Sequence, residues 1–128
     1  MKQNPISWFE IYVNDMPRAK KFYEAVFASS LENLNPPAGP MGEIEMQAFP
    51  SNMEVYGASG ALVKMEGVAA GGNSTLIYFD CEDCAVEASR VAEAGGKVER
   101  EKMSLGEFGF ISLVIDTEGN MIGLHSMD

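Results

Sequence analysis

The sequence predicts an α+β fold built from two βαβββ repeats. Two segments carry this prediction, ISWFEIYVNDMPRAKKFYEAVF (6–27) and NSTLIYFDCEDCAVEASRVAEAGG (73–96), because each reads as a strand, an Asp and a helix in that order. Three strand-like segments follow each helix, and the Gly-rich stretch GVAAGGNS (67–74) joins the two halves. Because neither half can readily bury its sheet alone, we expect the two half-sheets to pair.

In both repeats an aspartate is placed to cap the helix. Asp15 and Asp83 each follow a strand-like run, and an Asp side chain can accept a hydrogen bond from the first free amides of a helix. Pro17 falls in the first helical turn, where a missing N–H is tolerated. Gly95 and Gly96 are expected to end the second helix. The apolar residues at helical spacing are Ala19, Phe22, Tyr23, Val26 and Phe27, then Val86, Val91 and Ala94.

The remaining strands are short. They are expected at about residues 29–34, 43–49 and 59–65 in the first half, and 97–102, 108–116 and 121–126 in the second. DTEGN, between the last two, is typical of a hairpin turn, with Gly119 available for a positive φ. We therefore expect one domain over residues 1–128, with repeats over 5–66 and 74–127.

Composition narrows the class of partner. The net charge of −10 would repel the phosphates of nucleic acid and of acidic membranes. No run approaches 18 apolar residues, and the start, MKQNPISWFEI, lacks the apolar stretch of a secretion signal. These observations predict a cytoplasmic protein without nucleic-acid or membrane partners. The expected partners are a small molecule and a second copy of the chain, in a homodimer.

The two cysteines form a C-x-x-C pattern. Cys81 and Cys84 lie in DCEDC, and the two acidic residues between them are expected to raise the pKa of both thiols. A redox role would require a low-pKa thiol at a helix start. We therefore expect both to be free structural thiols.

Strand alternation predicts one face of each strand under a helix and the other lining a cleft. The cleft face would mix aromatic, polar and glycine residues, as small-molecule sites do. The alternative is a solvated sheet face, for which several of these side chains are too apolar. The candidate ligand-binding residues are Trp8, Tyr12, Leu62, Leu76, Tyr78, Phe110, Ser112 and Gly123.

Two motifs extend the argument to a family. The pattern D-x-x-x-A-x-x-F-Y opens the first helix, and D-T-E-G-N-x-I-x-L lies near the C-terminus. With the repeated βαβββ unit, they resemble the vicinal-oxygen-chelate superfamily of glyoxalases, bleomycin-resistance proteins and extradiol dioxygenases. The resemblance covers nearly the whole chain. It implies paired half-sheets around a U-shaped cleft, commonly completed in a homodimer.

The resemblance also implies where a divalent metal would be held. Its ligand positions fall at Trp8, Leu76, Gly123 and, by aligning SGAL with IGLH, Gly60. None of these side chains can donate to a metal. The chain has a single histidine, so one protomer cannot form a two-His site. We therefore expect no superfamily-type metal and no other cofactor.

Glu10 and His125 are the candidate catalytic residues, two positions beyond Trp8 and Gly123. Three interpretations stay open. The two side chains could form a displaced metal site with Asp80 or Glu45. They could form an acid–base or ligand-orienting pair. They could also be structural, with Glu10 paired to Lys64 and His125 at an exposed strand end.

These patterns lead to three functional hypotheses. The first is a metal-free superfamily member that binds a small, partly aromatic or apolar molecule, for sequestration or sensing. The second is an enzyme, a lyase or isomerase, that uses Glu10 and His125 or a shifted metal site. The third is a dimeric module whose cleft is vestigial.

Overall fold

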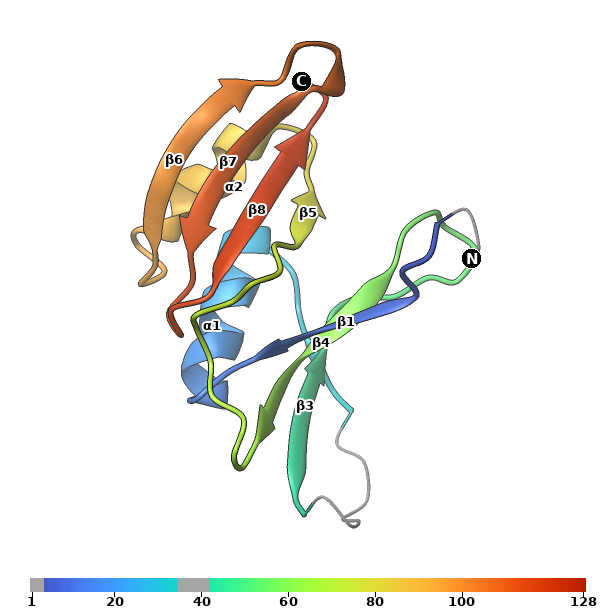
Figure 1. The fold of residues 1–128 in the computed structure, drawn as a ribbon, viewed down its shortest axis with the longest axis vertical. Helices are drawn as coiled ribbons and strands as arrows, with labels where there is room; N and C mark the ends of the chain where they lie inside the picture. Colours follow the sequence, from blue (N-terminus) through green and yellow to red (C-terminus); the bar gives the residue numbers. More distant parts are fainter. Residues whose placement is uncertain (1–3, 35–41) are drawn as a thin grey trace.

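The computed structural model describes residues 4–34 and 42–128. The chain forms two βαβββ units in succession, as predicted (Figure 1). The first unit comprises β1 (Trp8–Tyr12), α1 (Met16–Phe27), β2 (Glu32–Asn33), β3 (Ile44–Ala48) and β4 (Ser59–Met65). The second comprises β5 (Tyr78–Asp80), α2 (Cys84–Val91), β6 (Lys97–Ser104), the 3₁₀ turn η1 (Gly106–Phe108), β7 (Phe110–Ile115) and β8 (Met121–Ser126).

Each unit forms a four-stranded sheet with the same topology. The strand orders are β1-β4-β3-β2 and β5-β8-β7-β6. In each sheet the first strand pairs in parallel with the last strand of its unit, and the other pairs are antiparallel. Figure 1 shows the two sheets diverging, with β1 and β5 as their facing inner edges. This duplication confirms the α+β fold of two βαβββ repeats.

The helices begin where the two aspartates predict. The side chain of Asp15 accepts a hydrogen bond from the amide of Arg18, and that of Asp83 accepts one from the amide of Ala85. The second helix is shorter than expected, since it ends at Val91 and turns follow up to Gly95. Val86 is exposed rather than buried. None of the described helices is long and apolar enough to cross a membrane.

One apolar core joins both units. Phe9 from β1 and Phe79 from β5 lie 5.7 Å apart between ring centroids, at 90° to each other. Tyr23 and Phe27 of α1 complete the cluster, together with Phe49 beyond β3. Residues from α2, β7 and β8 belong to the same buried set. The core therefore fixes the two inner strands, β1 and β5, relative to each other.

The register of β4 corrects one predicted strand face. Leu62 pairs with Ile11, and neighbours across a sheet share a face. Leu62 is fully buried in the core with Ile11, so it does not face the cleft. Ala61 and Val63 instead share the face of Glu10 and Tyr12.

The register of β7 corrects a second predicted face. Ser112 pairs with Leu124 of the core, and its hydroxyl donates to the carbonyl of Arg100 at 2.7 Å. Ser112 is fully buried. Phe110 packs against the core, with Lys102 Nζ 4.6 Å from its ring centroid. Both residues therefore lie on the helix side of the sheet, and the expectation that they line the cleft was wrong.

Candidate functional site

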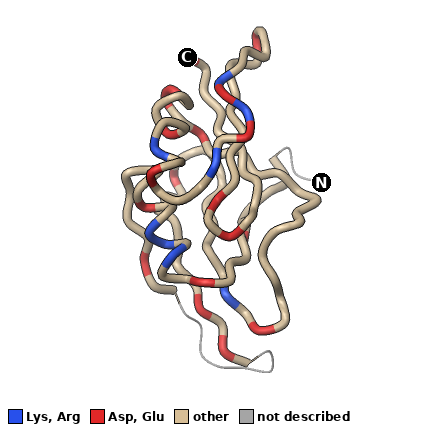
Figure 2. The backbone as a smooth tube through the Cα atoms, turned by 90° about the vertical axis from the view of Figure 1, so that its left-hand side faces the viewer, with Lys and Arg blue, Asp and Glu red and all other residues tan. Residues whose placement is uncertain are grey.

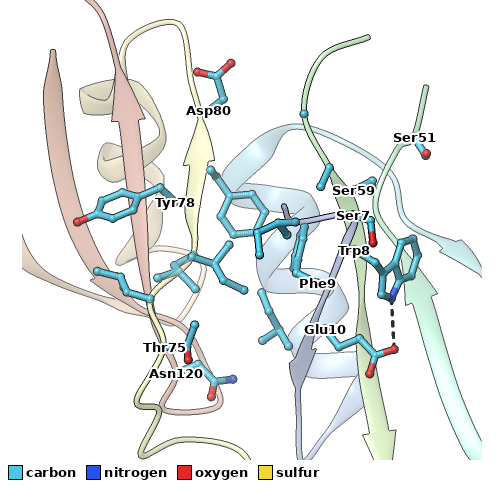
Figure 3. A pocket seen from close by; sticks show the side chains of 18 of the residues that line it. Ser7, Trp8, Phe9, Glu10, Ser51, Ser59, Thr75, Tyr78, Asp80 and Asn120 are labelled. Carbon is cyan, nitrogen blue, oxygen red and sulfur yellow. Dashed lines mark hydrogen bonds between the residues drawn. The ribbon is translucent and has the colours of Figure 1, made fainter. Parts of the chain in front are cut away.

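A cleft of about 1450 Å³ opens between β1 and β5 (Figure 3). Its lining comes from four parts of the chain: β1 with the two residues before it, the 50–59 loop, the segment that leads into and includes β5, and the start of β8. Both units thus contribute walls to one site. Because the floor includes Phe9 and Phe79, the cleft lies directly over the aromatic core.

The β1 wall carries two aromatic side chains with an acidic side chain between them. Trp8, Glu10 and Tyr12 alternate along the strand and therefore share a face. The carboxylate of Glu10 accepts a hydrogen bond from Trp8 Nε1 at 3.2 Å and one from the hydroxyl of Tyr12 at 2.8 Å. The hydrogen bond to Glu10 raises the pKa of Tyr12, with smaller effects from burial and from the charge of Glu10. Figure 3 shows Trp8 turned toward Glu10.

The opposite wall is formed by Leu76, Tyr78 and Asp80. The ring of Tyr78 lies over Gly123, because a Cβ built on Gly123 would be 2.3 Å from Tyr78 Cδ1. The glycine thus allows the ring to lie flat against β8. Tyr78 remains 46% exposed and Trp8 40% exposed, so both walls present aromatic surface to solvent.

A buried polar junction holds the two walls together. Both backbone amides at the start of α1, those of Asn14 and Asp15, donate to Glu118 Oε1 at 2.9 Å. Arg18 adds a bidentate contact, with Nε at 2.7 Å from Oε2 and Nη2 at 3.0 Å from Oε1. Burial alone would raise the pKa of Glu118, but the hydrogen bonds from Arg18 and the two amides lower it to about 2.

Asn120 and Asp116 extend this junction to the cleft. The side-chain amide of Asn120 donates a hydrogen bond from Nδ2 to the carbonyl of Tyr12 at 2.9 Å, and its Oδ1 accepts one from the backbone amide of Gly71 at 2.7 Å. Asp116 accepts from the buried hydroxyl of Tyr23 at 2.7 Å. The start of β8 is thereby tied to the end of β1. The DTEGN segment was predicted to form a turn and to belong to a family motif, so this role was missed, although four of its five residues carry side-chain hydrogen-bond acceptors.

The structure brings together five of the predicted site residues. Trp8, Glu10, Tyr12, Leu76 and Tyr78 all line the cleft. Gly123 lies behind the ring of Tyr78 rather than in the lining.

The contribution of the 50–59 loop to the cleft could not be predicted from the sequence. Met53, Val55 and Tyr56 line the cleft mouth and are largely exposed. No periodic pattern marks them in SNMEVYGASG, because they belong to neither a helix nor a strand.

His125 does not line the cleft with Glu10. It neighbours Asp80 in the sheet, and its Nε2 lies 2.7 Å from the carbonyl oxygen of Phe108. The imidazole therefore lies beneath the η1 turn, outside the cleft lining. The expected contact of Glu10 with Lys64 is also not formed, because the carboxylate contacts Trp8 and Tyr12 instead.

The residues at the implied metal positions do not fit the superfamily's usual ion. The register corrects one of these positions, because Ala61 pairs with Glu10 as Gly123 pairs with Tyr78, whereas Gly60 pairs with Phe9 on the core side. The equivalent of Gly123 is therefore Ala61. Trp8, Leu76, Ala61 and Gly123 offer no metal-donating side chain. Within the described ranges, no three His, Cys, Asp or Glu residues come close enough to hold an ion.

Comparison with known proteins supports this architecture. A family model for the Glyoxalase/Bleomycin resistance protein/Dioxygenase superfamily matches residues 5–124. A glyoxylase-like domain-containing protein of Didymella fabae is 30% identical over 119 residues, which cover 90% of this chain and 88% of that protein. A putative glyoxylase of Mycobacterium bovis is 27% identical over 125 residues, which cover 96% of this chain but 46% of that protein.

Solved structures share the fold at lower identity. Glyoxalase I from Zea mays superposes with a TM-score of 0.72 at 20% identity, covering 96% of this chain and 46% of that one. A glyoxylase/bleomycin resistance protein/dioxygenase domain from Frankia gives a TM-score of 0.69 at 17% identity, covering 98% of both chains. This chain thus spans about half the length of the Mycobacterium and maize proteins. By its family match and its fold, the chain belongs to the glyoxalase/bleomycin resistance protein/dioxygenase superfamily.

Proposed function

We propose that this protein binds a small, partly aromatic or apolar organic molecule in the cleft between β1 and β5, without the superfamily's usual divalent metal. The observation that carries the proposal is the pair of exposed aromatic residues, Trp8 and Tyr78, on opposite walls of one cleft. Sites that bind drug-sized molecules combine such apolar walls with a few placed polar groups. The role would be sequestration or sensing.

Aromatic walls favour a flat or apolar ligand. Each 100 Å² of apolar surface removed from water contributes about 2.5 kcal/mol before the cost of ordering is subtracted. A ligand between Trp8 and Tyr78 would cover surface on both walls. Met53 and Tyr56 at the mouth would add contacts from the loop.

Glu10 is the proposed orienting group. A carboxylate offers about four acceptor sites, and two hydrogen bonds, from Trp8 and Tyr12, are already present. These bonds fix the position of the carboxylate and leave acceptor capacity for a donor on the ligand. Glu10 would therefore select ligands that carry a hydrogen-bond donor beside their apolar part.

The test uses Trp8, the single tryptophan of the chain. Titration of a panel of aromatic metabolites and antibiotics should give a saturable change in tryptophan fluorescence, and calorimetry should give the same affinity. Trp8→Phe should weaken binding about three- to tenfold by calorimetry. Phe108→Leu, which changes an exposed aromatic residue outside the cleft, should leave the affinity unchanged. If no compound in the panel binds, the proposal fails.

The alternative of lyase or isomerase chemistry gains no support from the geometry. Its first version needs Glu10 and His125 to act on one substrate, and only Glu10 lines the cleft. Its second version needs a shifted metal site, and no three His, Cys, Asp or Glu residues come together in the part of the chain that the structure describes. The expected homodimer stays a prediction. Light scattering coupled to size exclusion would test it, and a mass of one chain would contradict it.

A further inference from the structure

The charges around the cleft have one sign. Within the described part of the chain, the lining contains two charged residues, Glu10 on the β1 wall and Asp80 on the β5 wall, and no Lys, Arg or His. The described Lys and Arg residues belong to α1, α2, β4 and β6. Figure 2 shows these basic positions as a few short blue segments on a backbone with more numerous acidic ones. Both walls of the cleft are therefore acidic.

Neither cleft carboxylate is neutralised by a described cation. Among the described residues, Glu10 accepts hydrogen bonds from the neutral groups of Trp8 and Tyr12. Elsewhere in residues 4–34 and 42–128, the ion pairs engage other acids, such as Glu118 with Arg18 at 2.7 Å and Asp83 with Lys102 at 2.8 Å. The two cleft acids thus have no cationic partner among the described residues, whereas Glu118 and Asp83, outside the cleft, each have one.

Aromatic faces accompany these carboxylates. Trp8 and Tyr12 flank Glu10, Tyr78 lies two residues before Asp80, and Tyr56 stands at the mouth. A cation over the face of a Trp or Tyr ring is attracted by about 0.5–2 kcal/mol, depending on how far it is desolvated. The same rings bury apolar surface. The combination suits a ligand that is both cationic and apolar.

The charge of the ligand decides the electrostatic cost of filling the cleft. A neutral ligand would remove water from Glu10 and Asp80 without compensating their charge, which is unfavourable. An anion would add repulsion from both walls. A cation offsets the lost hydration through charge-assisted contacts. Among ligands of similar shape, the cation should therefore bind most tightly.

We infer that the cleft selects a small organic cation, an amine or quaternary ammonium group attached to an aromatic or apolar body. The inference rests on the proposed function, because it assigns a ligand class to that same cleft. Glu10 and Asp80 would attract the ammonium group from the two walls, and Trp8 and Tyr78 would contact the apolar body.

The experiment compares three soluble probes that share a benzyl group: benzyltrimethylammonium, benzyl alcohol and phenylacetate. Calorimetry and Trp8 fluorescence at low ionic strength should give an affinity about tenfold higher for the cation than for the alcohol. Phenylacetate should bind most weakly. Added salt should weaken binding of the cation and leave that of the alcohol nearly unchanged.

Matched variants separate the cleft carboxylates from the overall negative charge. Glu10→Gln and Asp80→Asn should each reduce the cation affinity at least about threefold and spare the alcohol. Glu93→Gln removes one exposed carboxylate outside the lining, so it should leave both affinities unchanged. Equal losses in Glu93→Gln and Glu10→Gln would overturn the inference.

The three probes also test cation selectivity separately from ligand binding in the cleft. If the alcohol or phenylacetate binds as tightly as benzyltrimethylammonium, the cation selectivity is refuted and ligand binding in the cleft stands. If none of the three binds at millimolar concentration, both the selectivity and the proposed function fail.

Discussion

Two glutamates show how surroundings separate a structural carboxylate from a binding one. Glu118 has a fully buried side chain, a cationic partner in Arg18 and two backbone amide donors. Glu10 lies on an exposed strand face, and its donors are both neutral. Local sequence does not reveal this difference, because DTEGN around Glu118 predicts a turn and the alternation around Glu10 predicts a strand, and neither pattern shows which groups will contact the carboxylate. Only the partners brought in by the fold assign one to the junction and the other to the cleft.

The chemical properties of the two thiols also depend on their surroundings. Burial raises the pKa of Cys81 to about 12, with an added effect from the nearby carboxylate of Glu87. Cys84 is free and fully buried at the start of α2. The sequence predicted a raised thiol pKa from the acids between the cysteines. For Cys81 the direction is confirmed, but the main cause is burial.

We predict that neither thiol reacts readily in the folded protein. At pH 7 only on the order of one Cys81 side chain in 100,000 would be a thiolate, and the thiolate is the nucleophile. Ellman's reagent should modify the native protein at least about a hundredfold more slowly than free cysteine. Unfolding in urea should expose two reactive thiols per chain. Modification of the native protein as fast as that of free cysteine would contradict this prediction.

At the scale of elements, alternation predicted the faces of some strands and not of others. β1 alternates between core residues such as Phe9 and Ile11 and exposed ones such as Glu10, so the sequence predicts its two faces. In GALV of β4 and FISLVI of β7, apolar residues occupy both faces. Such strands are covered on both sides, and their alternation carries no information about which side faces a helix.

The register between paired strands also could not be predicted from the sequence. The choice of Gly60 rather than Ala61 differs by one residue, and one residue reverses the face of a strand. The register that decides it is a contact between β1 and β4, which are far apart in the chain. By contrast, the repeat, both helix caps and the β1 wall rest on local patterns, which the sequence shows directly.

Two glycines on the last strands of the units lead to a prediction with contrasting outcomes. A Cβ on Gly60 would lie 2.1 Å from the carbonyl oxygen of Phe9, a backbone atom that cannot move without disturbing β1. The three atoms nearest to a Cβ on Gly123 would all belong to the ring of Tyr78, a side chain that can turn away. Gly60→Ala should therefore lower the free energy of unfolding by about 2 kcal/mol or more.

Gly123→Ala should affect the cleft more than the fold. Its unfolding midpoint in urea should stay close to that of the original protein, while the affinity for a cleft ligand should change severalfold because Tyr78 turns. Urea titration and calorimetry of both variants provide the measurement. If Gly123→Ala proves the more destabilising of the two, the described register of β5 and β8 is wrong.

At the scale of the whole molecule, the polar junction substitutes for strand pairing between the sheets. Among the described strands, none of the first sheet pairs with one of the second. The units are joined instead by the aromatic core and by Glu118 and Asn120, which reach from the β7–β8 turn to the α1 start and the end of β1. The relative position of the cleft walls consequently depends on this junction as well as on the aromatic core.

The lowered pKa of Glu118 makes the contribution of the junction to stability depend on pH. In the folded protein the pKa of Glu118 is lowered from 4.5 to about 2 by its hydrogen bonds, whereas unfolding restores the ordinary value. A carboxyl group with a lowered pKa contributes stability that is fully present above pH 4.5 and is lost as the pH falls toward 2. Since one pKa unit corresponds to about 1.4 kcal/mol, this contribution amounts to about 3 kcal/mol.

Glu118→Gln should therefore lower the free energy of unfolding at pH 7 by about 3 kcal/mol and flatten the loss of stability between pH 4.5 and pH 2. Urea titrations monitored by circular dichroism across this range would measure both effects. Glu93→Gln, which removes an exposed carboxylate, serves as the control and should follow the original protein at every pH. Parallel pH curves for Glu118→Gln and the original protein would show that the charge of Glu118 does not hold the two units together.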